Sequence, residues 1–298
     1  MVITTRDGSD RIGRSIAAVL AAAAACRFHT ELIVVDNASV DSTAAVVTAI
    51  GAGDPRVRLV REPAPGQARA RTAGIGASRG DAILFTDDDV EVPPAWIERM
   101  SSPLLDGECD LIGTAVRLVP ELRRPGFEGL HLRLLADTTD GLGNPPKYLV
   151  GASLGFARRV IDAGVGFDSA LGPGALGFND DVQFFRDALA AGFRARFLGD
   201  VVCVHRPAAS RTEAAALIER CRRQGVCNAF LETRVGRRYT LRMIPGHLWR
   251  EARYAAARQA LRRAAAPVPP ACFLEKTVEI WRCRSLLKAR LGLQTRDH

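Results

Sequence analysis

Short apolar runs alternate with alanine-rich stretches along the first 90 residues, and this alternation restricts the possible folds more than any other feature of the sequence. Strands are predicted at Met1–Thr5, Glu31–Val35, Val57–Arg61 and Ala82–Thr86, with helices at Arg11–Cys26, Ser42–Ile50 and Gly66–Ser78. Strands that alternate with helices at this spacing are typical of a mainly parallel sheet with helices on both faces. The fold class is therefore predicted to be α/β.

Polar residues follow three of the predicted strands: Thr5-Arg6-Asp7, Asp36-Asn37 and Asp87-Asp88-Asp89. Ligands of such sheets bind outside the carboxyl ends of the strands, so these residues are candidates for a site. Taken alone, Asp36-Asn37 is more typical of a turn before a helix cap. The Asp triplet is different, because adjacent carboxylates after an apolar strand repel one another and raise one another's pKa. A divalent cation such as Mg²⁺ or Mn²⁺, which prefers oxygen ligands, relieves that repulsion.

The chain after residue 100 is less regular, and at least one long mobile loop is predicted within 120–127 and 137–146. Beyond it the sequence predicts a strand, a helix and two further strands: Tyr148–Ala157, Val182–Ala191, Arg194–Leu198 and Val201–His205. Gly151 and Gly155 would permit the close approach of neighbouring groups to the first of these strands. Asn179-Asp180-Asp181 opens the helix, where an ordinary N-cap is the simplest interpretation.

Two acidic clusters about ninety residues apart, and a histidine at the end of a later strand, suggest one composite site. This set suits displacement at the anomeric carbon of a sugar with a nucleoside diphosphate as the leaving group. A cation held by carboxylates and an imidazole would stabilise the departing diphosphate, and the second acidic cluster would supply a base for the acceptor hydroxyl. A metal-dependent hydrolase would use several histidines, whereas His205 is the only one of five that closes a strand beside polar residues.

Six segments resemble motifs of glycosyltransferase family 2 in that family's order and spacing, and they cover about residues 1–206. They are Thr4–Asp7, Ile33–Thr43, Ala70–Ile75, Asp87–Asp89, Asp180-Asp181 and His205. The resemblance implies a GT-A fold, with a Rossmann-like, mainly parallel or mixed sheet flanked by helices. It also implies a hexosyltransferase-type enzyme that inverts the anomeric configuration, with UDP as the commonest nucleotide of the donor.

The same resemblance assigns roles to individual residues. Asp36 would contact the base, Asp87 would lie toward the ribose, and Asp89 would bind the metal. Thr5, Arg6, Arg71 and Asp88 would complete the nucleotide-sugar pocket, and Asp87 and His205 would join Asp89 around Mn²⁺ or Mg²⁺. Asp181 would be the catalytic base, next to Asp180, which stands where the family usually has Glu.

Two other function classes are open at this stage. A sugar nucleotidyltransferase would carry a basic, glycine-rich loop after its first strand, whereas this chain has Arg6-Asp7-Gly8-Ser9-Asp10 there. A non-catalytic binding module would use the basic C-terminal tail on a membrane or on nucleic acid. Nucleic acid is not expected as a partner, because the remainder of the chain is acidic and has few aromatic residues for stacking.

Charge divides the chain into two predicted domains. Residues 211–298 hold 19 Lys/Arg and 7 Asp/Glu, while residues 1–210 carry a small negative charge. We therefore expect a catalytic domain at 1–210, with a nucleotide-binding half at about 1–100 and an acceptor half at 101–210, and a basic helical region at 211–298. The acceptor would be a glycan, a lipid-linked saccharide or a small molecule.

Two helices are predicted in the basic region, one with a weakly apolar stripe and one at Phe273–Leu291. The stripe follows helical spacing at Leu248, Ala252, Ala255, Ala256 and Ala260. Both helices either pack on the catalytic domain or attach the chain reversibly to an anionic membrane surface.

Seven cysteines without paired spacing predict reduced thiols. The expected location is the cytoplasm, with peripheral attachment to the inner face of the membrane as the alternative.

Overall fold

A computed structural model describes residues 1–139, 142–144, 146–264, 268–291 and 293. The loop predicted at 137–146 includes residues 140, 141 and 145, which lie outside the described residues. The chain divides into two compact units. The sheet unit comprises residues 1–119, 136–175 and 180–207, and the helical unit comprises residues 120–135, 176–179 and 208–298.

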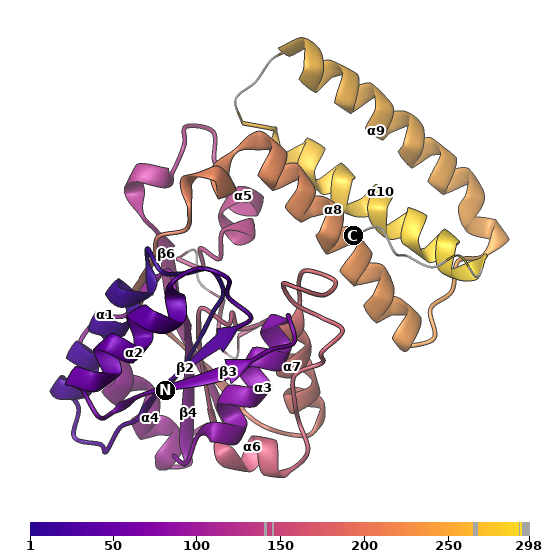
Figure 1. The fold of residues 1–298 in the computed structure, drawn as a ribbon. Helices are drawn as coiled ribbons and strands as arrows, with labels where there is room; N and C mark the ends of the chain where they lie inside the picture. The colour runs from indigo at the N-terminus through magenta and orange to yellow at the C-terminus, as the bar shows by residue number, and fades with distance from the viewer. Residues whose placement is uncertain (140–141, 145, 265–267, 292, 294–298) are drawn as a thin grey trace. The chain divides into compact units, whose positions relative to one another are not determined.

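The sheet unit contains a mixed eight-stranded sheet in the order β3-β2-β1-β4-β7-β6-β8-β5 (Figure 1). Its strands are β1 (Val2–Thr5), β2 (Leu32–Asn37), β3 (Val57–Glu62), β4 (Ala82–Asp87), β5 (Val90–Glu91), β6 (Leu111–Leu118), β7 (Ser153–Ala157) and β8 (Ala195–His205). Strands β1 to β4 are parallel, whereas β7 runs antiparallel to both β4 and β6. The α/β prediction of a mainly parallel or mixed sheet is therefore confirmed.

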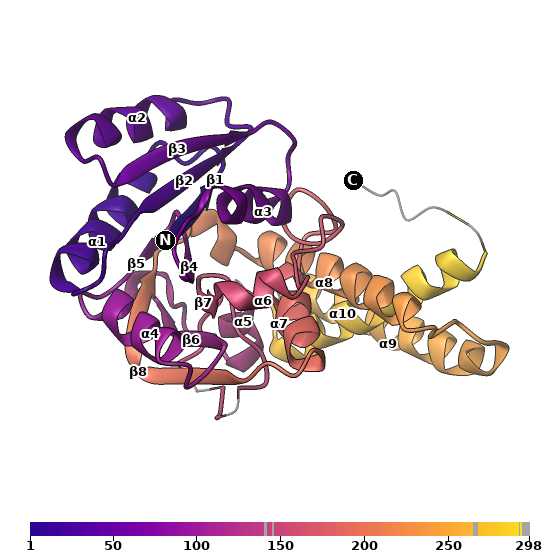
Figure 2. The same ribbon diagram turned by 90° about the horizontal axis from the view of Figure 1, so that it is seen from below.

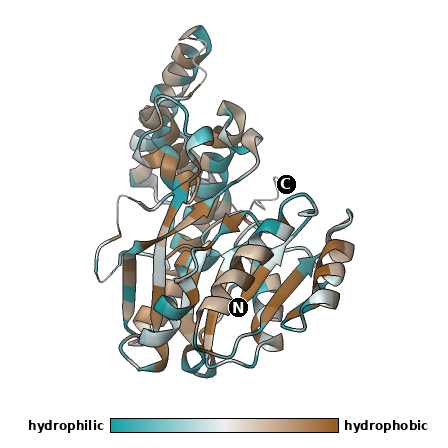
Figure 3. Ribbon diagram, turned by 90° about the vertical axis from the view of Figure 1, so that its left-hand side faces the viewer, coloured by the Kyte–Doolittle hydropathy of each residue, from teal (hydrophilic) through white to brown (hydrophobic). Residues whose placement is uncertain are grey.

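Helices cover both faces of this sheet because its central strands are apolar on both sides (Figures 2 and 3). On one face Ile3 and Val34 pack with α1 (Ile12–Ala25), α2 (Thr43–Gly53) and α4 (Trp96–Leu105). On the other face Val2 and Val35 pack with α3 (Gln67–Ala77), α6 (Arg158–Asp162) and α7 (Asp180–Ala190). Successive side chains of a strand point to opposite faces, so each strand contributes to both cores.

Two strand predictions need correction. The predicted strand Tyr148–Ala157 is extended only at Ser153–Ala157. The segments predicted as separate strands at 194–198 and 201–205 form the single strand β8. Along β6 the pairing register jumps from Leu198 to Val202, so residues 199–201 form an irregularity within the strand instead of a turn.

Helices α5 (Gly129–Leu134), α8 (Ala214–Arg234), α9 (Ile244–Ala264) and α10 (Ala271–Arg290) build the helical unit, with 3₁₀ turns at Pro120–Leu122, Ala209–Thr212 and Leu241–Met243. The sequence pattern does not predict α8 as a separate helix. Gly225 of α8 allows a close approach to α10, since a Cβ at this position would lie 2.4 Å from the carbonyl oxygen of Val278. The ion pair between Arg282 and Glu232 (3.0 Å) also joins these two helices.

Helix α9 packs on α10 through polar side chains. Arg250 pairs with Glu279 and Glu251 pairs with Arg284, at 2.5 and 2.6 Å, while Tyr254 stacks on Phe273. The stripe predicted from the sequence faces away from this contact: its Leu248 is 65% exposed, and its four alanines are exposed as well. Among the helices that the structure describes, none is long and apolar enough to span a membrane.

Candidate active site

The register of the sheet brings the polar strand ends to one edge, as the sequence predicts. Thr5 of β1 lies opposite Asp36 of β2, and Thr4 lies opposite Asp87 of β4. Two strand spacings therefore separate the backbones at Asp36 and Asp87, which is about 10 Å. At the far end of the sheet Val90 pairs with His205, and this pairing brings the histidine beside Asp89.

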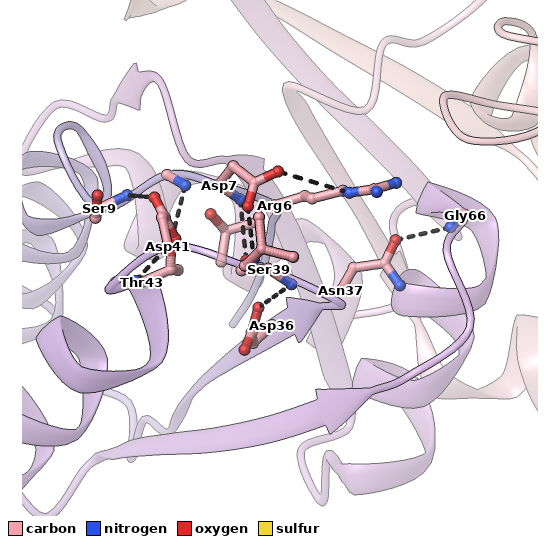
Figure 4. Close-up of polar contacts among 12 residues, drawn as sticks. Arg6, Asp7, Ser9, Asp36, Asn37, Ser39, Asp41, Thr43 and Gly66 are labelled. Atoms are coloured by element: carbon pink, nitrogen blue, oxygen red, sulfur yellow. Dashed lines mark hydrogen bonds and ion pairs between the residues drawn. The ribbon is translucent and has the colours of Figure 1, made fainter.

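The loops after β1 and β2 are fastened to each other by hydrogen bonds (Figure 4). Asp41 accepts the backbone N–H of Ser9 at 3.1 Å, and Thr43 accepts that of Gly8 at 2.8 Å. Asp7 adopts φ of 48° and accepts the N–H of Val40 at 2.8 Å. These contacts give the edge of the sheet a defined shape beside β1 and β2.

Asp36 and Asn37 use this framework differently. Asp36 is buried and accepts the N–H of Ser39 through Oδ1 at 3.1 Å. Asn37 accepts the N–H of Gly66 at 2.8 Å and so holds the loop that leads into α3 (Figure 4). Arg6 is about half exposed, with its Nε 3.8 Å from Asp7. The structure thus places Arg6 directly after β1 and Asp36 at the end of the neighbouring strand β2.

Asp88 and Thr5 hold the fold together at this edge. The Thr5 hydroxyl donates to Asp88 at 2.6 Å, and Arg11 donates to the same carboxylate oxygen at 3.0 Å. Gly8 leaves room for the pair, since a Cβ there would lie 2.3 Å from the Thr5 oxygen. The family resemblance implies that both residues lie in the nucleotide-sugar pocket, whereas nothing in the sequence singles out Arg11, the first residue of the helix predicted at Arg11–Cys26.

Asp87 and Asp89 differ in their surroundings. Desolvation raises the pKa of Asp87 to about 6; Arg71 opposes this rise, while the neighbouring Asp89 and Asp88 add to it. Gln67 donates to Asp87 at 3.3 Å, a contact that the sequence did not reveal. Asp89 and His205 are both buried, with Oδ2 and Nε2 3.3 Å apart. Within the described ranges, no three His, Cys, Asp or Glu side chains are grouped so that they could hold a metal by themselves.

Arg71 makes the most deeply buried ion pair of the site. Its side chain is 3% exposed and donates to Asp180 at 2.5 Å, while its other terminal nitrogen lies 3.7 Å from Asp87. Burial raises the pKa of Asp180, and the guanidinium of Arg71 opposes that rise. Removing one partner of such a buried pair typically costs about 3–5 kcal/mol, because the other charge is left uncompensated. Arg71, expected in the nucleotide pocket, thus binds the acidic cluster at the start of α7.

Asp181 has a different environment from the adjacent Asp180. Its Oδ2 accepts the backbone N–H of Gly151 at 2.7 Å, and its Oδ1 accepts that of Val182 at 2.8 Å. Asp181 is partly exposed, whereas Asp180 is buried. Of the two carboxylates, Asp181 is therefore the one that an incoming hydroxyl could reach. The sequence indicated close approach at Gly151 but not that its N–H would hold this carboxylate.

Comparison with known proteins matches residues 1–159, more than half of the chain, to the family described as Glycosyl transferase family 2. The succinoglycan biosynthesis protein ExoO of Rhizobium meliloti is 42% identical over 139 residues. That match covers 46% of this chain and 36% of ExoO, so the alignment spans about a third of the relative's length.

Two solved structures share the fold. A mannosyltransferase of Pyrobaculum calidifontis, in complex with GDP-Man and Mn²⁺, has a TM-score of 0.59 at 20% identity and covers all of this chain and 87% of its own. A glucosyl-3-phosphoglycerate synthase of Mycobacterium tuberculosis, in complex with Mn²⁺, UDP-glucose and phosphoglyceric acid, has a TM-score of 0.50 at 23% identity. The match covers 74% of this chain and 78% of the synthase chain. The fold is thus of the GT-A type, and the chain belongs to glycosyltransferase family 2.

Proposed function

We propose that this glycosyltransferase moves a sugar from a nucleoside diphosphate, with UDP as the first candidate, to a hydroxyl of its acceptor with inversion at the anomeric carbon. One observation carries the proposal. The acidic strand ends at Asp36 and Asp87–Asp89 lie along one edge of the sheet, which we call the donor edge, and Asp181 offers a partly exposed carboxylate held by backbone N–H groups. The acceptor is a glycan, a lipid-linked saccharide or a small molecule.

The donor would bind along the edge formed by β1, β2 and β4. The buried Asp36 carboxylate can accept an N–H of the base, and Arg6, about half exposed, can meet the negative charge of the phosphates. Asp87 lies about 10 Å farther along the same edge, within range of the ribose. Thr5 and Asp88 contribute indirectly, because their mutual hydrogen bond fixes the end of β1 beside that path.

Asp89 and His205 fit a divalent cation. A carboxylate oxygen and an imidazole nitrogen 3.3 Å apart, both buried, offer the mixed O and N donors that suit Mn²⁺ and are compatible with Mg²⁺. Such a cation would neutralise charge on the departing diphosphate, whose own oxygens would complete the coordination. Asp87, the third predicted ligand, faces Gln67 and Arg71.

Asp181 would act as the base for the acceptor hydroxyl. Its carboxylate is oriented by two backbone N–H groups and retains lone pairs that can accept a proton as the new glycosidic bond forms. Asp180 cannot serve in the same way without giving up its buried ion pair with Arg71.

Asp181→Asn should lower kcat by about 10²–10⁴-fold, because the amide cannot take the acceptor proton, while donor binding stays nearly unchanged. Steady-state kinetics with varied donor concentration measure both quantities. Asp187→Asn is the matched control, since this exposed carboxylate lies on the same helix. A fully active Asp181→Asn enzyme would exclude the proposed base, and a larger loss of turnover in a folded Asp180→Asn enzyme would move that role to Asp180.

Asp89→Asn should abolish turnover and leave the fold intact, because it removes the charged oxygen of the proposed cation site. EDTA should likewise stop turnover by the wild-type enzyme, and Mn²⁺ or Mg²⁺ should restore it. Asp106→Asn removes an exposed carboxylate elsewhere and is the control. Full activity in EDTA would refute the metal requirement.

We further propose that α9 attaches the chain reversibly to an anionic membrane surface, which would suit a lipid-linked acceptor. Leu248 and Trp249 are 65% and 57% exposed, and Arg253 stacks on the Trp249 ring at 4.3 Å. Exposed arginines continue along the helix at 258, 262 and 263. The acidic residue of α9, Glu251, is half-buried in its ion pair with Arg284, so the outward face is apolar and positive.

Sedimentation with vesicles containing anionic lipid tests this attachment. Replacing Arg258, Arg262 and Arg263 with Gln should weaken binding by about 3 kcal/mol, or on the order of 10²-fold, since each basic residue near such a surface contributes about 1 kcal/mol. The control replaces three exposed arginines elsewhere, Arg61, Arg79 and Arg186. Binding should require anionic lipid and weaken with salt. Equal binding of both triple variants would rule out α9 as the attachment site.

A further inference from the structure

We propose that Arg71 and Gly151 form a clip that positions Asp181 for catalysis and connects it to the donor edge. The inference rests on the proposed function, because it concerns the alignment of the proposed base. Arg71 is a positioning residue in this scheme, and its guanidinium packs against the backbone of Gly151. The clip consists of contacts within the sheet unit alone.

The first half of the clip is the contact between Gly151 and both partners. The Gly151 N–H donates to Asp181 at 2.7 Å. The Cα of the same residue faces the guanidinium so closely that a Cβ would lie 1.9 Å from Nη2 and 2.5 Å from Cζ of Arg71. Any side chain at this position would displace Arg71, the backbone at 151, or both. The orientation of Asp181 therefore depends on how Arg71 is seated.

The second half of the clip is the ion pair with Asp180. Nη1 of Arg71 binds Asp180 at 2.5 Å, and Gly172, at φ of +82°, makes room for that carboxylate, since a Cβ there would lie 2.9 Å from Cγ of Asp180. Asp180 and Asp181 are adjacent in α7. The start of the helix is therefore held at two successive residues. The side chain of Arg71 binds Asp180, and the backbone N–H of Gly151 binds Asp181.

The guanidinium also reaches the donor edge. Nη2 lies 3.7 Å from Asp87, and the rings of Phe85 and Phe167 lie 6.0 and 5.4 Å from Cζ. Arg has a rigid planar fork with several donors, so one side chain can contact two carboxylates in fixed directions. The residue proposed to lie near the ribose and the residue beside the proposed base thus share one cation.

Gly151→Ala tests the clip without removing any charge. The Cβ should displace Arg71 and tilt Asp181, and kcat should fall on the order of 10²-fold, as expected for a displacement of about 1 Å. The KM for the donor should change by no more than about threefold. Gly76→Ala is the control, because this exposed glycine lies on the same helix as Arg71 and its Cβ would meet nothing within 4 Å. Wild-type kcat in Gly151→Ala would overturn the clip.

The double variant Arg71→Met with Asp180→Leu separates positioning from folding and covers the case in which Gly151→Ala does not fold. Replacing both partners of a buried ion pair with apolar residues commonly preserves stability. Asp87, which Arg71 also approaches, is partly exposed to solvent and keeps the hydrogen bond from Gln67. Thermal unfolding and donor binding should therefore show a folded protein whose kcat has fallen as in Gly151→Ala. Wild-type kcat in this variant would show that the pair serves only the fold.

The wild-type enzyme is assayed first with a panel of nucleoside-diphosphate sugars, with slow donor hydrolysis as the readout that needs no acceptor. An absence of turnover by the wild type refutes the proposed function itself. Turnover by the wild type at a rate that both variants retain refutes the clip and leaves the proposed function standing. Loss of kcat in both variants, with the Gly76→Ala control active, supports the clip.

Discussion

Carboxylates form two groups in the sheet unit, three at and directly after the end of β4 and two at the start of α7, and the repulsion within each group is the constraint around which this region is organised. Buried charges are tolerated only when they are paired and hydrogen-bonded. Asp88 is bound by Thr5 and Arg11, and Asp180 is bound by Arg71. These partners come from β1, from the residue before α1 and from α3, so compensating the charge also fixes elements far apart in the sequence.

The carboxylates differ in how far a neighbouring positive charge offsets their negative charge. Removing one partner of a buried ion pair such as Arg71 and Asp180 lowers the free energy of unfolding by about 3–5 kcal/mol, whereas an exposed ion pair contributes only about 0–1 kcal/mol to it. Asp180 and Asp88 each have a cationic partner in the fold. Asp181 is held by two backbone N–H groups, and Asp89 lies beside the imidazole of His205. These last two carboxylates are the ones that we propose as the base and as a ligand of the cation.

The sequence predicted the positions of the site residues better than their partners. Parallel strands share a carboxyl edge, and that rule alone was sufficient to place Asp36 and Asp87 on one side of the sheet. The partners were harder to predict, because Arg11 and the N–H of Gly151 meet their carboxylates across 77 and 30 residues of chain. Helix α8 was missed since its apolar periodicity is interrupted by polar residues that pair within the helical unit.

In helix α9 the helical spacing of apolar residues is predicted correctly, but this spacing does not determine which face of the helix packs on α10. The predicted stripe exists, but the face packed on α10 is the polar one. Arg250 and Glu251 form ion pairs with residues of α10, and Tyr254 stacks on an aromatic ring of that helix. Alanine carries too little apolar area to decide which side is buried, whereas two ion pairs and one stacked ring are specific. The helix therefore exposes Leu248 and Trp249 beside arginines, and this outward face is the one that we propose for attachment to an anionic surface.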